Sequence, residues 1–127
     1  LAKRGVDLSG TILKANMVLP GRESGVKALP LEVANATLRA LKVSVPPQLP
    51  GVVFLSGGQS PDEATANLNE INKLKGDIPW ELSFSFARAL QEEPLRAWKG
   101  KDGNVKAAQQ VFARRVRLVS LARQGKL

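Results

Sequence analysis

The chain of 127 residues contains no cysteine, so disulfide bonds are excluded and a reducing compartment is permitted. No apolar run approaches the roughly 20 residues that a membrane-spanning helix needs, and the N-terminus lacks a signal-peptide pattern. We therefore expect no association with a membrane. The first residue is Leu1 rather than methionine, and the chain opens in the middle of a pattern. This opening predicts that the sequence is a piece of a longer protein.

Acidic residues are scarce beside basic ones, 11 against 19, and the net charge is +8. Such a balance is typical of proteins that bind nucleic acid, but too few aromatic residues lie among the charges to form a base-stacking surface. We therefore do not expect nucleic acid, whereas phosphorylated metabolites would also suit a positive field. Most of the excess charge lies late in the chain, where it predicts a solvated basic face comprising Arg96, Lys99, Lys101, Lys106, Arg114, Arg115, Arg117, Arg123 and Lys126.

Three short apolar runs alternate with helical patterns, which is typical of βα units and a parallel sheet. The runs predict strands at about 10–14, 51–55 and 80–86. Between the first two strands, apolar residues at helical spacing predict a helix from Leu31 to Val43. The fold class indicated by this alternation is α/β.

A complete helix-start signal follows the second run. Ser60 is suited to the N-cap, Pro61 to the first helical position and Glu63 to closing a capping box, and the helix should end near Leu74. A long last helix is predicted to begin near Asn104. Its expected buried side comprises Val105, Ala108, Val111, Phe112, Val116, Val119 and Leu121.

Each predicted strand ends in a residue that could take part in chemistry, at the edge where parallel α/β folds bind ligands. Lys14 ends the first strand. Burial disfavours the charged form of an ammonium group, and a neutral lysine amine is a nucleophile that forms a Schiff base with a ketone. Most strand-end lysines are solvated surface residues, and the local pattern leaves that alternative open.

The other two strand ends are suited to a phosphate. Ser56-Gly57-Gly58 offers backbone N–H groups that no side chain obstructs, although a plain tight turn has the same pattern. Arg88 follows Ser85 at the third strand end, and its guanidinium matches phosphate oxygens bidentately. An ion pair between Arg88 and Glu92 is the alternative. Together, the three strand ends favour a nucleophile beside a phosphate site.

Motifs of a known family lie in matching order and spacing along almost the whole chain. They are Leu13–Val18, Phe54–Ser60, Trp80–Gln91, Leu95–Trp98, Asn104–Gln109 and Ser120–Lys126. In these motifs the chain resembles the last third of class I fructose-bisphosphate aldolases. The resemblance implies a (β/α)8 TIM barrel, of which residues 1–127 supply the last three βα units and the C-terminal helix as part of a single domain.

The resemblance also implies a glycolytic, cytoplasmic lyase that cleaves fructose 1,6-bisphosphate to dihydroxyacetone phosphate and glyceraldehyde 3-phosphate. Lys14 matches the Schiff-base lysine of the family. The site for the C1 phosphate matches Ser56, Gly57, Gly58, Ser85, Ala87 and Arg88. No metal or other cofactor is implied, because the iminium supplies the electrophile. The implied ligand is a sugar bisphosphate, and the implied assembly is a homo-oligomer, a tetramer in the family.

The chain departs from the family pattern at several points. Ala15 stands where the family usually has proline, and Phe86-Ala87 stands where it usually has Tyr-Gly. The aspartate, second lysine and glutamate that handle proton transfers in the family have no counterpart here, and there is no tyrosine for the family's mobile tail. We therefore expect these 127 residues alone to be inactive.

A non-catalytic function is the rival hypothesis. The chain could be a basic module that binds an acidic polymer through its last helix. Polymer binding would weaken steeply with added salt, whereas a pocket for one bisphosphate would retain a preference for sugar stereochemistry.

Overall fold

The computed structural model describes residues 1–127, apart from the side chain of Ala2. The elements, in chain order, are β1 (Ile12–Ala15), α1 (Pro30–Ser44), β2 (Gly51–Phe54), α2 (Pro61–Leu74), β3 (Glu81–Phe84), α3 (Arg88–Trp98) and α4 (Val105–Arg123), with 3-10 turns at Ala2–Arg4, Leu8–Gly10 and Asp102–Asn104. The predicted alternation of strands and helices is confirmed. Among the described residues, no helix is long and apolar enough to cross a membrane.

The three strands form a parallel sheet in the order β1-β2-β3. Lys14 lies opposite Val53 in register, and Val53 lies opposite Ser83. The strands are shorter than expected: residue 10 belongs to a 3-10 turn, residue 11 precedes β1, and residues 55, 80, 85 and 86 lie outside the ladder. The first strand also ends one residue later than predicted, at Ala15. Two further hydrogen bonds continue the pairing, from the N–H of Leu55 to the Ala15 carbonyl and from the N–H of Ser85 to the Phe54 carbonyl.

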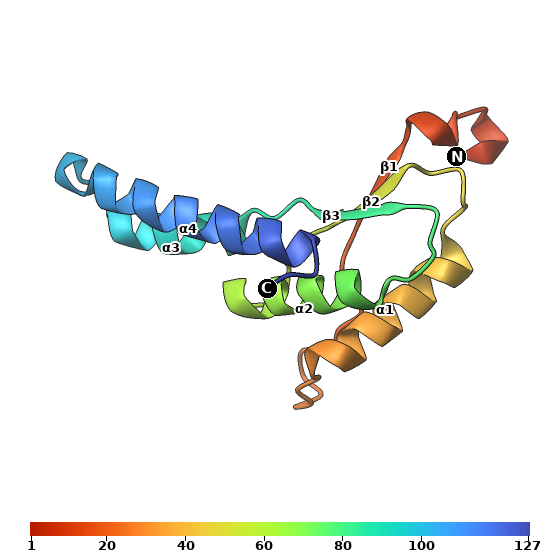
Figure 1. The fold of residues 1–127 in the computed structure, drawn as a ribbon, viewed down its shortest axis with the longest axis horizontal. Helices are drawn as coiled ribbons and strands as arrows, with labels where there is room; N and C mark the ends of the chain where they lie inside the picture. The colour runs from red at the N-terminus through yellow and green to blue at the C-terminus, as the bar shows by residue number, and fades with distance from the viewer.

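The sheet has one covered and one open face. Successive side chains of a strand point to opposite faces, and on one face Val52, Phe54 and Leu82 are fully buried. They join a core with α1 and α2, which lie on one side of the sheet in Figure 1. On the other face Lys14 is exposed, and Val53 and Ser83 are only partly buried, since no described element packs there.

The start of α2 matches the predicted signal in full. The Ser60 hydroxyl accepts a hydrogen bond from the Glu63 N–H at 3.2 Å, and the Glu63 carboxylate accepts one from the Ser60 N–H at 2.8 Å. This second bond is the main reason why the pKa of Glu63 is lowered. Ser60 thereby ends the loop after β2 and begins the helix at a defined residue.

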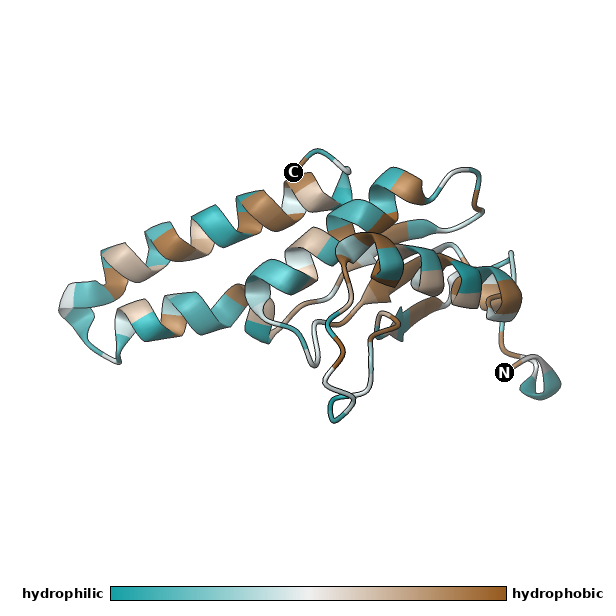
Figure 2. Cartoon of the chain, turned by 90° about the horizontal axis from the view of Figure 1, so that it is seen from below, coloured by the Kyte–Doolittle hydropathy of each residue, from teal (hydrophilic) through white to brown (hydrophobic). Residues whose placement is uncertain are grey.

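Helix α3 is absent from the sequence-based prediction. It contains Pro94, which cannot donate a helical hydrogen bond. Ala89 is its only buried residue, and the other described residues of α3 are partly or fully exposed. Its pattern is therefore not that of a helix with a broad apolar face. Packing along α4 stabilises it instead, and the two helices run side by side away from the sheet (Figure 1, Figure 2).

The predicted buried side of α4 is partly wrong. Val105, Phe112 and Val116 are exposed, whereas the buried residues are Arg115, Val119 and Ala122. Only the C-terminal half of α4 reaches the core, and hydrophobic residues recur along its outer half beyond the sheet (Figure 2). The basic face is exposed as predicted, with one exception. That exception is Arg115, which is 1% exposed.

Candidate active site at the carboxyl ends of the strands

Lys14 lies on β1, one residue before the end of the strand, and points to the open face of the sheet. The structure leaves it exposed. The described residues therefore do not by themselves desolvate its ammonium group, because nothing in them covers this face. What the fold does provide is position: Lys14 lies at the carboxyl edge, beside the loop that follows β2.

The Ser56-Gly57-Gly58 loop forms a tight turn directly after β2. The Ser56 carbonyl accepts a hydrogen bond from the Gln59 N–H, and Gly58 has φ of +80°, which L-residues with a side chain rarely adopt. Within the part of the chain that the structure describes, the N–H groups of Gly57 and Gly58 donate to no backbone carbonyl. They are thus available for an anion.

A side-chain hydrogen bond joins this loop to the first strand end. The Asn16 amide, two residues after Lys14, donates to the Gly57 carbonyl at 3.3 Å. The third strand end is joined through the Ser85 N–H, which donates to the Phe54 carbonyl at 2.8 Å. The three segments that sequence reasoning singled out are therefore brought together at one edge of the sheet.

Arg88 is the first residue of α3 and is exposed. No acidic residue lies in the first turn of this helix, and no side chain caps it within the described chain. The positive end of α3 is therefore available to an anion, unlike that of α2, where Asp62 and Glu63 already complement it.

Glu92, the alternative partner of Arg88, pairs with another residue. Glu92 forms an ion pair with Arg96, four residues on, and no ion pair joins Glu92 to Arg88 among the described residues. The guanidinium of Arg88 thus remains free of this competitor.

Within the described residues, no three His, Cys, Asp or Glu side chains come together in a group that could hold a metal ion.

A family model, "Glycolytic: Fructose-bisphosphate aldolase class-I", matches residues 1–127. The chain therefore belongs to the class I fructose-bisphosphate aldolases. It is 54% identical over 125 residues to the Arabidopsis thaliana protein "Fructose-bisphosphate aldolase 4, cytosolic", covering 98% of this chain and 32% of that one. It is 50% identical over 126 residues to fructose-bisphosphate aldolase C of Pan troglodytes, covering 99% of this chain and 35% of the relative.

The chain thus spans about a third of the length of these relatives and corresponds to their C-terminal portion. Its fold is similar to that of the Plasmodium falciparum fructose-bisphosphate aldolase, solved in complex with TRAP and a small-molecule inhibitor. The TM-score is 0.91 at 52% identity, over 96% of this chain and 35% of that one. The predicted family and the α/β fold class, a portion of a TIM barrel, are confirmed.

Two departures from the aldolase pattern have a structural explanation. Phe86, in place of the family's tyrosine, is buried, and its ring lies 5.5 Å from that of Phe84 between centroids. Ala87, in place of glycine, has φ of −100°, so the backbone there does not require glycine. Nothing in the structure explains Ala15 in place of proline.

The sequence pattern placed Arg115 on the solvated basic face, whereas the structure buries its guanidinium against the helices that follow β2 and β3. A signal was present in the helical spacing. Val111, Arg115 and Val119 follow one another at intervals of four residues, so Arg115 lies in line with the apolar stripe rather than with the basic face.

Proposed function

We propose that residues 1–127 are the C-terminal part of a single aldolase barrel domain that cleaves fructose 1,6-bisphosphate, with Lys14 as the Schiff-base lysine. The observation that carries the proposal is the position of Lys14 on the open sheet face, at the carboxyl edge where the Gly57–Gly58 loop follows the neighbouring strand, in a chain of this family. The assignment of each site residue rests on this geometry and on the family pattern.

In this mechanism the neutral amine of Lys14 attacks the C2 ketone of the open-chain substrate, and loss of water gives an iminium. The iminium accepts the electron pair of the C3–C4 bond as that bond breaks, so glyceraldehyde 3-phosphate leaves and an enamine remains. Protonation and hydrolysis of the enamine release dihydroxyacetone phosphate and regenerate the lysine. Residues outside this chain would carry the proton transfers.

The phosphate contacts would fix C2 within reach of Lys14. The C1 phosphate would accept hydrogen bonds from the loop of Ser56, Gly57 and Gly58, and from the segment of Ser85, Ala87 and Arg88. Holding the ketone in one place beside the amine turns an encounter between two molecules into a step within one complex.

The proposal extends to location and assembly. Relatives of this chain are named as cytosolic or cytoplasmic isozymes, and we place this aldolase in the cytoplasm as well. We further propose a homo-oligomer, with the tetramer of the family as its form. A sugar bisphosphate is the small molecule that it would bind.

Trapping the iminium tests the assignment of Lys14. Sodium borohydride added with dihydroxyacetone phosphate to the full-length protein should reduce the adduct and attach a three-carbon phosphate to Lys14, as read by peptide mass spectrometry. Lys42→Arg, on the exposed side of α1, is the control and should leave the labelling unchanged. Labelling at another lysine, or at none, would overturn the assignment.

Removal of Arg88 tests the phosphate pocket. Arg88→Ala removes a charge-assisted contact, so affinity for the bisphosphate should fall about 10- to 100-fold, equivalent to about 1.5–3 kcal/mol. A substrate without the C1 phosphate should be affected far less. Arg39→Ala, at an exposed arginine on α1, is the matched control. Equal losses on both substrates would show that Arg88 is structural.

A further inference from the structure

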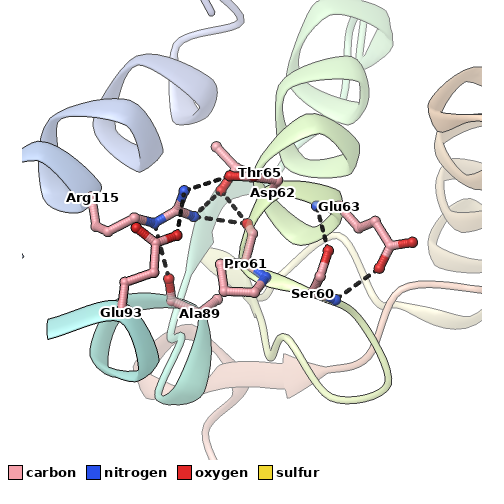
Figure 3. Close-up of polar contacts among 8 residues, drawn as sticks. All are labelled: Ser60, Pro61, Asp62, Glu63, Thr65, Ala89, Glu93 and Arg115. Atoms are coloured by element: carbon pink, nitrogen blue, oxygen red, sulfur yellow. Dashed lines mark hydrogen bonds and ion pairs between the residues drawn. The ribbon is translucent and has the colours of Figure 1, made fainter. Parts of the chain in front are cut away.

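The guanidinium of Arg115 lies at the meeting point of three helices, α2, α3 and α4 (Figure 3). Its Nη1 donates to the Asp62 carboxylate at 2.8 Å and lies 3.7 Å from that of Glu93. Its Nη2 donates to the Pro61 carbonyl at 2.8 Å and to the Thr65 hydroxyl at 2.7 Å. Its Nε donates to the Ala89 carbonyl at 3.3 Å.

These partners come from the two helix starts that border the candidate phosphate site. Pro61 is the first residue of α2 and directly follows the loop that holds Gly57 and Gly58. Ala89 is the second residue of α3 and directly follows Arg88. The planar guanidinium of Arg115 therefore joins α2 to α3. Its contact on α3, Ala89, is the residue next to Arg88, the proposed phosphate ligand.

Burial of this group is costly unless every donor is satisfied, and removal of one partner would leave an uncompensated charge. A well-packed apolar side chain in the same place is often as stabilising as a buried ion pair. Stability alone is therefore a weak reason for an arginine at this position. The property that an apolar residue cannot supply is a rigid fork that binds α2 and α3 at one set distance.

We propose that Arg115 is a positioning residue that sets the separation between the two halves of the phosphate pocket. The inference rests on the proposed function, since it assigns a role in binding the C1 phosphate. A phosphate that bridges the loop amides and the Arg88 fork needs both within hydrogen-bond distance at once. Without the Arg115 contacts, α3 and α2 can shift relative to each other, and the pocket fits the phosphate less closely.

The test compares two probes that differ only in the phosphate. The full-length protein is trapped with borohydride at graded concentrations of dihydroxyacetone phosphate, or of dihydroxyacetone, and label on Lys14 is quantified. In Arg115→Met and Arg115→Lys, the half-saturating concentration of the phosphate probe should rise about 10-fold, equivalent to about 1.4 kcal/mol. Lysine keeps the charge but not the fork. Dihydroxyacetone should label as in the wild type.

Arg117→Met, at an exposed arginine two residues on in α4, is the matched control and should leave both probes unchanged. A thermal melt of each variant reports whether it folds. If the half-saturating concentrations of both probes rise equally, or that of dihydroxyacetone phosphate does not change, the inference is wrong and the proposed function still stands. A wild type that neither probe labels at Lys14 would overturn the proposed function and the inference with it.

Thr65→Val decides the question if both Arg115 variants fail to fold. It removes the hydroxyl that accepts from Nη2 while keeping the buried shape and the charge balance. The half-saturating concentration of dihydroxyacetone phosphate should rise, by a smaller factor than in the Arg115 variants. That of dihydroxyacetone should not change. A folded Thr65→Val protein with wild-type response to the phosphate probe would overturn the inference.

Discussion

Lys14→Arg in the full-length protein should abolish cleavage of fructose 1,6-bisphosphate. A guanidinium stays protonated at every pH where the protein is folded, so it cannot attack the C2 ketone. Removal of the covalent nucleophile from a serine protease lowers kcat by on the order of 10⁶-fold, and we expect a loss of several orders of magnitude here as well. The measurement is the initial rate of glyceraldehyde 3-phosphate release in a coupled assay.

Binding separates this chemical loss from a structural one. Lys14 is exposed on the open sheet face and its side chain makes no hydrogen bond or ion pair among the described residues, so the arginine variant should keep the fold and still bind the substrate phosphates. Lys42→Arg should retain full turnover. Retention of more than about one hundredth of the wild-type rate by Lys14→Arg would show that another group forms the covalent intermediate.

Residues 1–127 expressed alone should be inactive as an aldolase and poorly soluble or partly unfolded. In the described structure β1 and β3 each have one neighbouring strand, so each presents an unpaired edge. Large apolar side chains are also exposed, among them Ile12 at 62% on the open sheet face and Val43 at 83% on α1. Such surfaces favour association between copies of the chain.

A second apolar surface lies between the outer halves of α3 and α4. Leu95 and Trp98 of α3 and Phe112 of α4 line a groove there, and all three are exposed. The test of the isolated chain is a cleavage assay, a thermal melt and size-exclusion chromatography. A cooperative melt of a monomer with substantial turnover would show that the chain is self-sufficient and that the incomplete-barrel hypothesis is wrong.

Local signals account for what could be predicted. The start of α2 was predicted to the residue, because a capping box satisfies backbone N–H groups within four neighbouring positions and needs no distant partner. The strands were located by their apolar runs, and their lengths were overestimated, since a ladder ends where the partner strand ends. The candidate site was predicted because chemistry-bearing residues follow the strands directly.

Helix α3 shows where local signals fail. Pro94 interrupts its pattern, and its stability comes from α4, a helix that begins after Trp98 and returns beside it. The buried side of α4 was misjudged for a related reason. Helical spacing identifies an apolar stripe, but the stripe is buried only where another element reaches it, and the core meets α4 only near Val119 and Ala122.

The sequence by itself determined the family, the parallel βα order and the residues at the three strand ends, because each depends on motifs within short segments. Only the tertiary structure decided that Lys14 faces an open sheet surface and that Arg115 is buried between helix starts more than 20 residues away. Exposure and burial depend on which distant segments pack together. From sequence alone, a charged side chain is predicted to be solvated. Its burial becomes possible only when the fold places carbonyl and carboxylate groups around it.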